Sequence, residues 1–228
     1  MNTRILSQKG AQIQIVVETQ GVVFTPDNLL SVLKNNEFQI VQGLVSNPLN
    51  STLPAQNTQI YSKDSLMIYL LLTQPLNTLV FALMNTVDLK NQKIGGKPSS
   101  DMIRDLMDSL NLVDETISAI TFNFTTRFIA TKKPIDRLSK LIKLDFLRKM
   151  KKDPLLRTLN VLSIRLGDVF PIEKQGFNIV IEPLLSNPEK MFFIQFTKKL
   201  INRDSLFKVV NEFPRTLENL INGFDSND

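Results

Sequence analysis

The chain contains no cysteine, no histidine and no tryptophan in 228 residues. The lack of cysteine excludes disulfides, thiolate metal sites and thiol nucleophiles. The lack of histidine removes the usual general base near neutral pH and the commonest ligand of transition metals. We therefore predict that the protein is not an enzyme and that it needs no cofactor and no metal ion.

Hydrophobic residues make up 43% of the chain and charged residues 21%, a balance typical of folded domains rather than disordered ones. The first ten residues, MNTRILSQKG, contain neither the long apolar run nor the small-residue cleavage site of a secretory signal. Together with the lack of cysteine, this predicts a cytoplasmic protein.

One long uncharged segment, Ser65 to Met84, has about the length of a membrane-spanning helix. Its middle, Thr73 to Thr78 (TQPLNT), is polar and contains a proline, at the depth where a spanning helix should be most apolar. Two apolar runs around such a turn are typical of a β-hairpin. We predict a buried hairpin and no membrane span.

The order of predicted elements occurs twice along the chain. The strand-like run Gln12–Phe24 leads through Thr25 and Pro26 into an amphipathic helix, and Ile117–Ala130 leads into a second such helix near Pro134. This predicts an α+β protein of two pseudo-repeats, residues 1–112 and 113–228, that share one curved antiparallel sheet backed by helices.

Shorter sequence patterns predict the remaining strands and helices of the two halves. Strand candidates are 38–45, 158–166 and a hairpin of 177–181 with 191–197, and helix candidates are 101–112 and 204–222. The last helix is predicted to end at Gly223.

Two resemblances follow from these segments. The order of elements is similar to the half-domain of the TATA-box-binding protein fold, at the level of topology alone. Ile120–Ile129 (ITFNFTTRFI) and Met191–Phe224 resemble a sporadically distributed family of uncharacterised prokaryotic proteins, in which an Asn precedes the Arg and Thr126 stands here instead. That resemblance implies a compact body of two halves and no particular activity.

The positive charge of the chain is concentrated in residues 132–157, which carry ten Lys or Arg and three Asp, whereas the whole chain is +5. An ordinary solvated helix face, a nucleic-acid contact and an acidic protein partner all fit such a segment. The candidate contact residues are Lys132, Lys133, Arg137, Lys140, Lys143, Arg148, Lys149, Lys151 and Lys152.

Two further patterns favour structural roles. Gly95–Ser100 (GGKPSS) lacks the spacing of a phosphate-binding Walker loop. The longer stretch Asn91–Ser100 is predicted to be a flexible connection, with Ser99 or Ser100 as the cap of the next helix. Asp101, Asp105 and Asp108 share one helix face, and no loop with calcium-site spacing accompanies them.

Fifteen phenylalanines dominate the aromatic content, and six of them are predicted to pack a core between sheet and helices: Phe122, Phe124, Phe128, Phe192, Phe193 and Phe196. We predict a non-catalytic binding or scaffold protein that acts in a protein assembly or as a homo-oligomer. Nucleic-acid binding through residues 132–157 is the first alternative, and a carrier of hydrophobic ligands is the second.

Overall fold

The computed structural model describes residues 10–21, 23, 25–41, 58–73, 76–129, 138, 163–167, 176–187 and 190–225. The described chain is a mixed α+β structure, as predicted, with one large antiparallel sheet, a small two-stranded sheet and three helices. The strands are β1 (Gln12–Thr19), β2 (Gln39–Ile40), β3 (Thr58–Lys63), β4 (Leu66–Thr73), β5 (Leu76–Met84), β6 (Lys93–Ile94), β7 (Lys97–Pro98), β8 (Ile117–Ile129), β9 (Ile164–Gly167), β10 (Gly176–Pro183) and β11 (Met191–Leu200).

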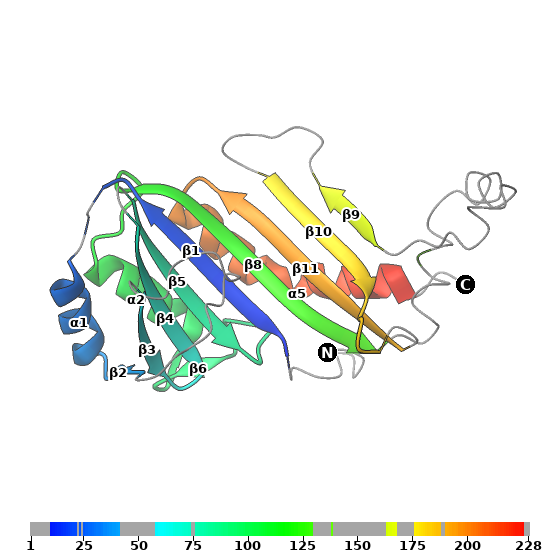
Figure 1. The fold of residues 1–228 in the computed structure, drawn as a ribbon, viewed down its shortest axis with the longest axis horizontal. Helices are drawn as coiled ribbons and strands as arrows, with labels where there is room; N and C mark the ends of the chain where they lie inside the picture. Colours follow the sequence, from blue (N-terminus) through cyan, green and yellow to red (C-terminus); the bar gives the residue numbers. More distant parts are fainter. Residues whose placement is uncertain are drawn as a thin grey trace, which may run out of the picture.

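The large sheet has nine strands in the order β2-β3-β4-β5-β1-β8-β11-β10-β9 (Figure 1). The strands β1 and β8, far apart in the sequence, pair antiparallel in the middle, with Gln14 opposite Asn123 and Val16 opposite Thr121. Pairing continues outward from β1 to β5 and from β8 to β11. The central pair therefore joins the first and second parts of the chain into one sheet.

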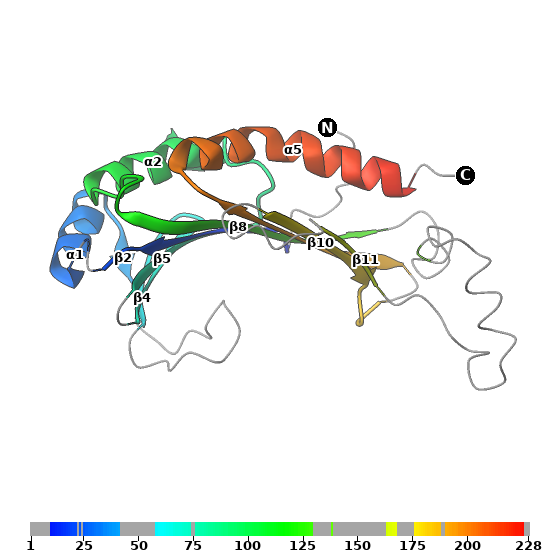
Figure 2. The same cartoon turned by 90° about the horizontal axis from the view of Figure 1, so that it is seen from above.

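The three helices are α1 (Pro26–Asn35), α2 (Ser99–Ser109) and α5 (Arg203–Asp225). Figure 2 shows α2 and α5 along one face of the sheet, which bends away from them toward both ends. The start of α1 follows the prediction, because Thr25 is its N-cap, accepts a hydrogen bond from the Asn28 backbone N–H at 3.2 Å and precedes Pro26. None of the described helices is long and apolar enough to span a membrane.

The main core lies between the sheet and the helices. Alternate residues of the central strands point into it, among them Ile13 and Ile15 of β1 and Phe122 and Phe124 of β8, all at most 1% exposed. Phe213 of α5 packs against three phenylalanines of the sheet, with ring centroids 5.0 Å from Phe122, 4.7 Å from Phe124 and 5.2 Å from Phe196. Aromatic packing thus holds α5 on the second part of the sheet.

The hairpin predicted for residues 65–84 is present as β4 and β5, which pair antiparallel over their full lengths. Several predicted boundaries were wrong. The first strand ends at Thr19, earlier than predicted, because the chain turns at Gly21, whose φ is +72°. At the other end of the chain, α5 passes Gly223 and reaches Asp225.

The prediction of a flexible connection over residues 91–100 was also wrong. The strands β6 and β7 form a tight hairpin whose turn residues Gly95 and Gly96 have φ of +55° and +84°. The backbone N–H of Gly95 donates to the Asp64 carboxylate at 2.7 Å, which fixes this hairpin to the β3–β4 turn. Neither predicted serine is the cap of α2, because Pro98 occupies that position and Ser99 already belongs to the helix.

Candidate functional site

The basic segment 132–157 lies outside the described residues, apart from Leu138. The nine candidate contact residues between Lys132 and Lys152 therefore remain predictions. Leu138 is helical and fully buried. Its burial fits the amphipathic helix that is predicted to begin near Pro134.

The face of the large sheet opposite α2 and α5, which neither of these helices covers and which is called here the helix-free face, carries cross-strand rows of uncharged polar side chains. Successive residues of a strand point to opposite faces, so the phenylalanines of β8 face the helices and the residues between them face the other way. The register places two such rows across the central strands, Gln14–Asn123–Thr197–Asn178 and Gln12–Thr125–Gln195. They come from β1, β8, β11 and β10.

Several of these amides and hydroxyls form no hydrogen bond within the described part of the chain. Gln14 is only 9% exposed, yet its side chain forms no hydrogen bond with any residue of the described chain. The same holds for the side chains of Asn123, Gln195 and Thr197. A buried polar group that lacks a hydrogen-bond partner costs free energy. Gln14 is buried without a partner in the described chain, and Asn123, Gln195 and Thr197 are half-exposed on the neighbouring strands, so this part of the face is the most direct candidate for a contact surface.

Next to the polar rows, the helix-free face carries a small apolar cluster made of Val16, Ile60, Tyr69, Val80 and Ala82. Each of these side chains is at most 9% exposed. The Tyr69 hydroxyl donates to the Met67 sulfur at 3.4 Å, and burial raises the pKa of Tyr69 above its ordinary value. The face therefore has an apolar zone over β3, β4 and β5 and a polar zone over β8, β11 and β10.

Among the residues that the structure describes, charged side chains on the helix-free face are few and of both signs. The exposed cations are Arg127, Arg165 and Lys199, and the carboxylates are Glu18 and Glu182. By register, Phe193 lies directly between Arg127 and Glu182 across three neighbouring strands. Phe193 thus belongs to this face, and its predicted place in the core with the other phenylalanines was wrong.

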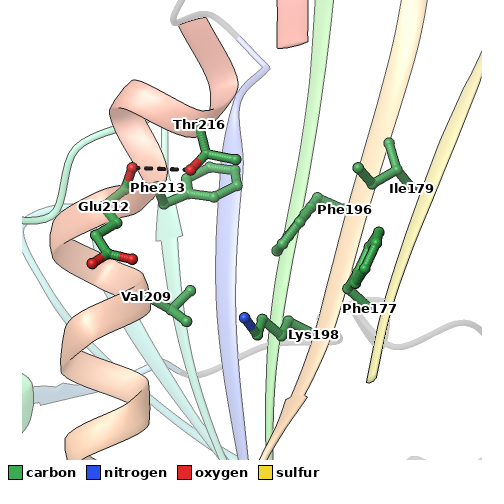
Figure 3. A pocket seen from close by; sticks show the side chains of 8 residues that line it. All are labelled: Phe177, Ile179, Phe196, Lys198, Val209, Glu212, Phe213 and Thr216. Carbon is green, nitrogen blue, oxygen red and sulfur yellow. Dashed lines mark hydrogen bonds between the residues drawn. The ribbon is translucent and has the colours of Figure 1, made fainter. Parts of the chain in front are cut away.

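A pocket lies on the opposite side of the sheet, between α5 and the strands β10 and β11 (Figure 3). Its volume is about 240 Å³, and its apolar walls are Phe177, Ile179, Phe196, Val209 and Phe213. Three polar residues, Lys198, Glu212 and Thr216, complete the lining. A carrier of hydrophobic ligands was among the predicted alternatives, but no sequence pattern marked the walls of this pocket, because they come from three elements that meet only in the fold.

The aspartates that share a face of α2 have structural partners. Asp105 forms an ion pair with Lys97 at 2.9 Å, and Asp108 pairs with the Arg203 guanidinium at the start of α5. The described residues contain no group of three or more acidic side chains placed to hold a metal ion. These carboxylates tie α2 to its neighbours.

No protein-family model, no curated protein and no solved structure matches the chain. The helix-free face and the pocket are therefore the features of the described chain that bear on its function.

Proposed function

We propose that the protein is a non-catalytic binding or scaffold protein that self-associates through the helix-free face of its sheet. The observation that carries this proposal is the set of amide and hydroxyl side chains on the central strands without hydrogen-bond partners in the described chain. A second copy of the chain is the occupant that best fits their chemistry.

An amide carries both a donor and an acceptor, and a hydroxyl can serve as either. A surface made of Gln14, Asn123, Gln195 and Thr197 can therefore pair with its own copy when the copy is rotated by a two-fold axis. A strongly charged surface would repel its copy, whereas this face carries cations and carboxylates together. Two-fold pairing of identical surfaces is also the commonest form of homo-oligomer.

Light scattering coupled to size exclusion tests the proposal directly. The wild-type chain should elute at micromolar concentration with twice its mass of 25.9 kDa. Thr197→Glu should return it to a monomer, because Thr197 lies in the middle of a polar row and the change places like charges near each other across the axis.

The matched control is Leu185→Glu, which adds the same charge to a loop residue that is 96% exposed. This variant should stay dimeric. A wild-type chain that remains a monomer over the whole micromolar range, or a Thr197→Glu variant that is still a dimer, would contradict the proposal.

A duplicated origin of the two halves is a further part of the proposal. Reading outward from the centre, the order β1-β5-β4-β3 corresponds to β8-β11-β10-β9, and each series is followed in sequence by a helix, α2 or α5. This correspondence supports pseudo-repeats of residues 1–112 and 113–228. It also supports the topological similarity to the TATA-box-binding protein fold, which stays a proposal.

Nucleic-acid binding is the second candidate. The observation that favours it is the group of exposed cations Arg127, Arg165 and Lys199 on the second part of the helix-free face, together with the basic segment 132–157. The double variant Lys140→Glu with Lys143→Glu should weaken binding, and affinity should fall steeply with salt. The absence of any gel shift with single- or double-stranded DNA or RNA at low salt would exclude this function.

A further inference from the structure

The pocket between α5 and the sheet has the chemistry of a small amphiphile site. Its five apolar walls include three phenylalanines, and its volume is about 240 Å³. At about 30 Å³ for each water-sized group, this volume accommodates roughly eight groups of the size of a methylene. A short aliphatic chain fits, whereas a long one does not.

One cationic group lines this apolar space. Lys198 belongs to β11, and its side chain points to the helix side of the sheet, because the register sets it beside Phe122 and opposite Phe177. Figure 3 shows the Lys198 side chain reaching toward α5 and Val209. Its ammonium forms no ion pair and no hydrogen bond with any residue of the described chain.

We propose that this pocket binds a medium-chain carboxylate, with the aliphatic chain among the phenylalanines and the carboxylate on the Lys198 ammonium. Burial of the chain supplies the apolar part of the affinity, and the charge-assisted hydrogen bond to Lys198 selects an anion over a neutral head group. This site is on the face opposite the self-association surface, so the two functions are separable.

Glu212 is the charged group that opposes an anion in the pocket. It lines the same space from α5, and its carboxylate lies beyond ion-pair distance from Lys198 in the structure. A bound carboxylate therefore experiences attraction from Lys198 and repulsion from Glu212. Replacing Glu212 by glutamine should tighten binding if the ligand is an anion.

Titration calorimetry with octanoate, octanol and octylamine on the full chain tests the proposal. Octanoate should bind with micromolar affinity and more tightly than the other two. Lys198→Gln should weaken octanoate binding about ten-fold and remove the preference over octanol. The matched control is Lys199→Gln, which changes the next residue of β11, on the other face of the sheet, and should leave the affinity unchanged.

A second variant separates the pocket from nonspecific binding. Val209→Trp fills the space from the α5 side and should abolish octanoate binding, while circular dichroism checks that the fold is retained. Three results would overturn the proposal: no heat of binding with octanoate, equal affinities for all three compounds, or octanoate binding that survives in both Lys198→Gln and Val209→Trp.

Discussion

The contact of Phe213 with the sheet predicts a large and specific loss of stability. Phe213 is 3% exposed and touches phenylalanines of both β8 and β11. A buried Phe→Ala change costs about 3–5 kcal/mol, because the removed ring loses its transfer free energy and leaves a cavity. Phe213 holds three aromatic contacts at once, so we expect Phe213→Ala to lower the free energy of unfolding by about 4 kcal/mol.

Urea unfolding followed by circular dichroism measures this difference. For a chain of this length each kcal/mol shifts the melting temperature by about 2–4 °C, so Phe213→Ala should melt about 8–16 °C lower than wild type. Phe213→Leu keeps most of the apolar volume and should cost less than about 2 kcal/mol. Leu185→Ala, at a residue that is 96% exposed, should cost less than about 0.5 kcal/mol.

A Phe213→Ala loss below about 1 kcal/mol, close to that of Leu185→Ala, would refute the packing of α5 against the central strands. If Phe213→Leu lowered the free energy of unfolding as much as Phe213→Ala does, the cause would be distortion of α5 rather than the missing ring. The ratio of the two losses is thus as informative as the larger one.

Three other variants probe electrostatics. Arg203→Ala should lower the free energy of unfolding by about 1 kcal/mol, because the Arg203 side chain is only 17% exposed and joins α5 to Asp108 of α2. Lys97→Ala breaks the ion pair with Asp105, but the Lys97 side chain is 60% exposed. This change should cost almost no stability in the same urea titration. Burial raises the pKa of Tyr69 above 10.0, because the buried phenol is more stable neutral than ionised. The contribution of the neutral phenol to stability is therefore complete below about pH 10 and is lost as the pH rises further and the phenol ionises. The urea midpoint of the wild-type chain should therefore fall between about pH 8 and pH 11, and it should fall less in Tyr69→Phe. The decrease that remains in the variant is due to Tyr61, whose pKa is also raised by burial. A decrease of the same size in the variant would contradict the burial of Tyr69.

The sequence predicted local structure well where a single signal was sufficient. Apolar runs around the polar turn of residues 73–78 defined the β4–β5 hairpin, and Thr25 with Pro26 marked the start of α1. The predicted ends of strands and helices were wrong where the backbone conformation depends on contacts with residues far away in the sequence. The β6–β7 hairpin, for example, is fixed by Asp64, a contact that no local pattern reveals.

The pairing of strands could not be predicted in the same way. Alternation tells which face a residue occupies, but any two apolar strands could be neighbours, so the β1–β8 pair emerges only from the fold. Part of the polar rows could be predicted from the sequence, because Asn123 and Thr125 alternate with Phe122 and Phe124. What the sequence could not supply was their alignment with Gln14 and Thr197 on other strands.

The central position of the β1–β8 pair has a consequence for how the chain folds during synthesis. The partner of Gln12 is Thr125, so one edge of β1 stays unpaired until more than half of the chain has been made. An exposed edge strand invites pairing with other chains, and contacts between residues so far apart slow folding. A nascent or truncated first half is therefore expected to aggregate more readily than the full chain. Pairing with β8 covers the exposed edge of β1 and should remove this tendency.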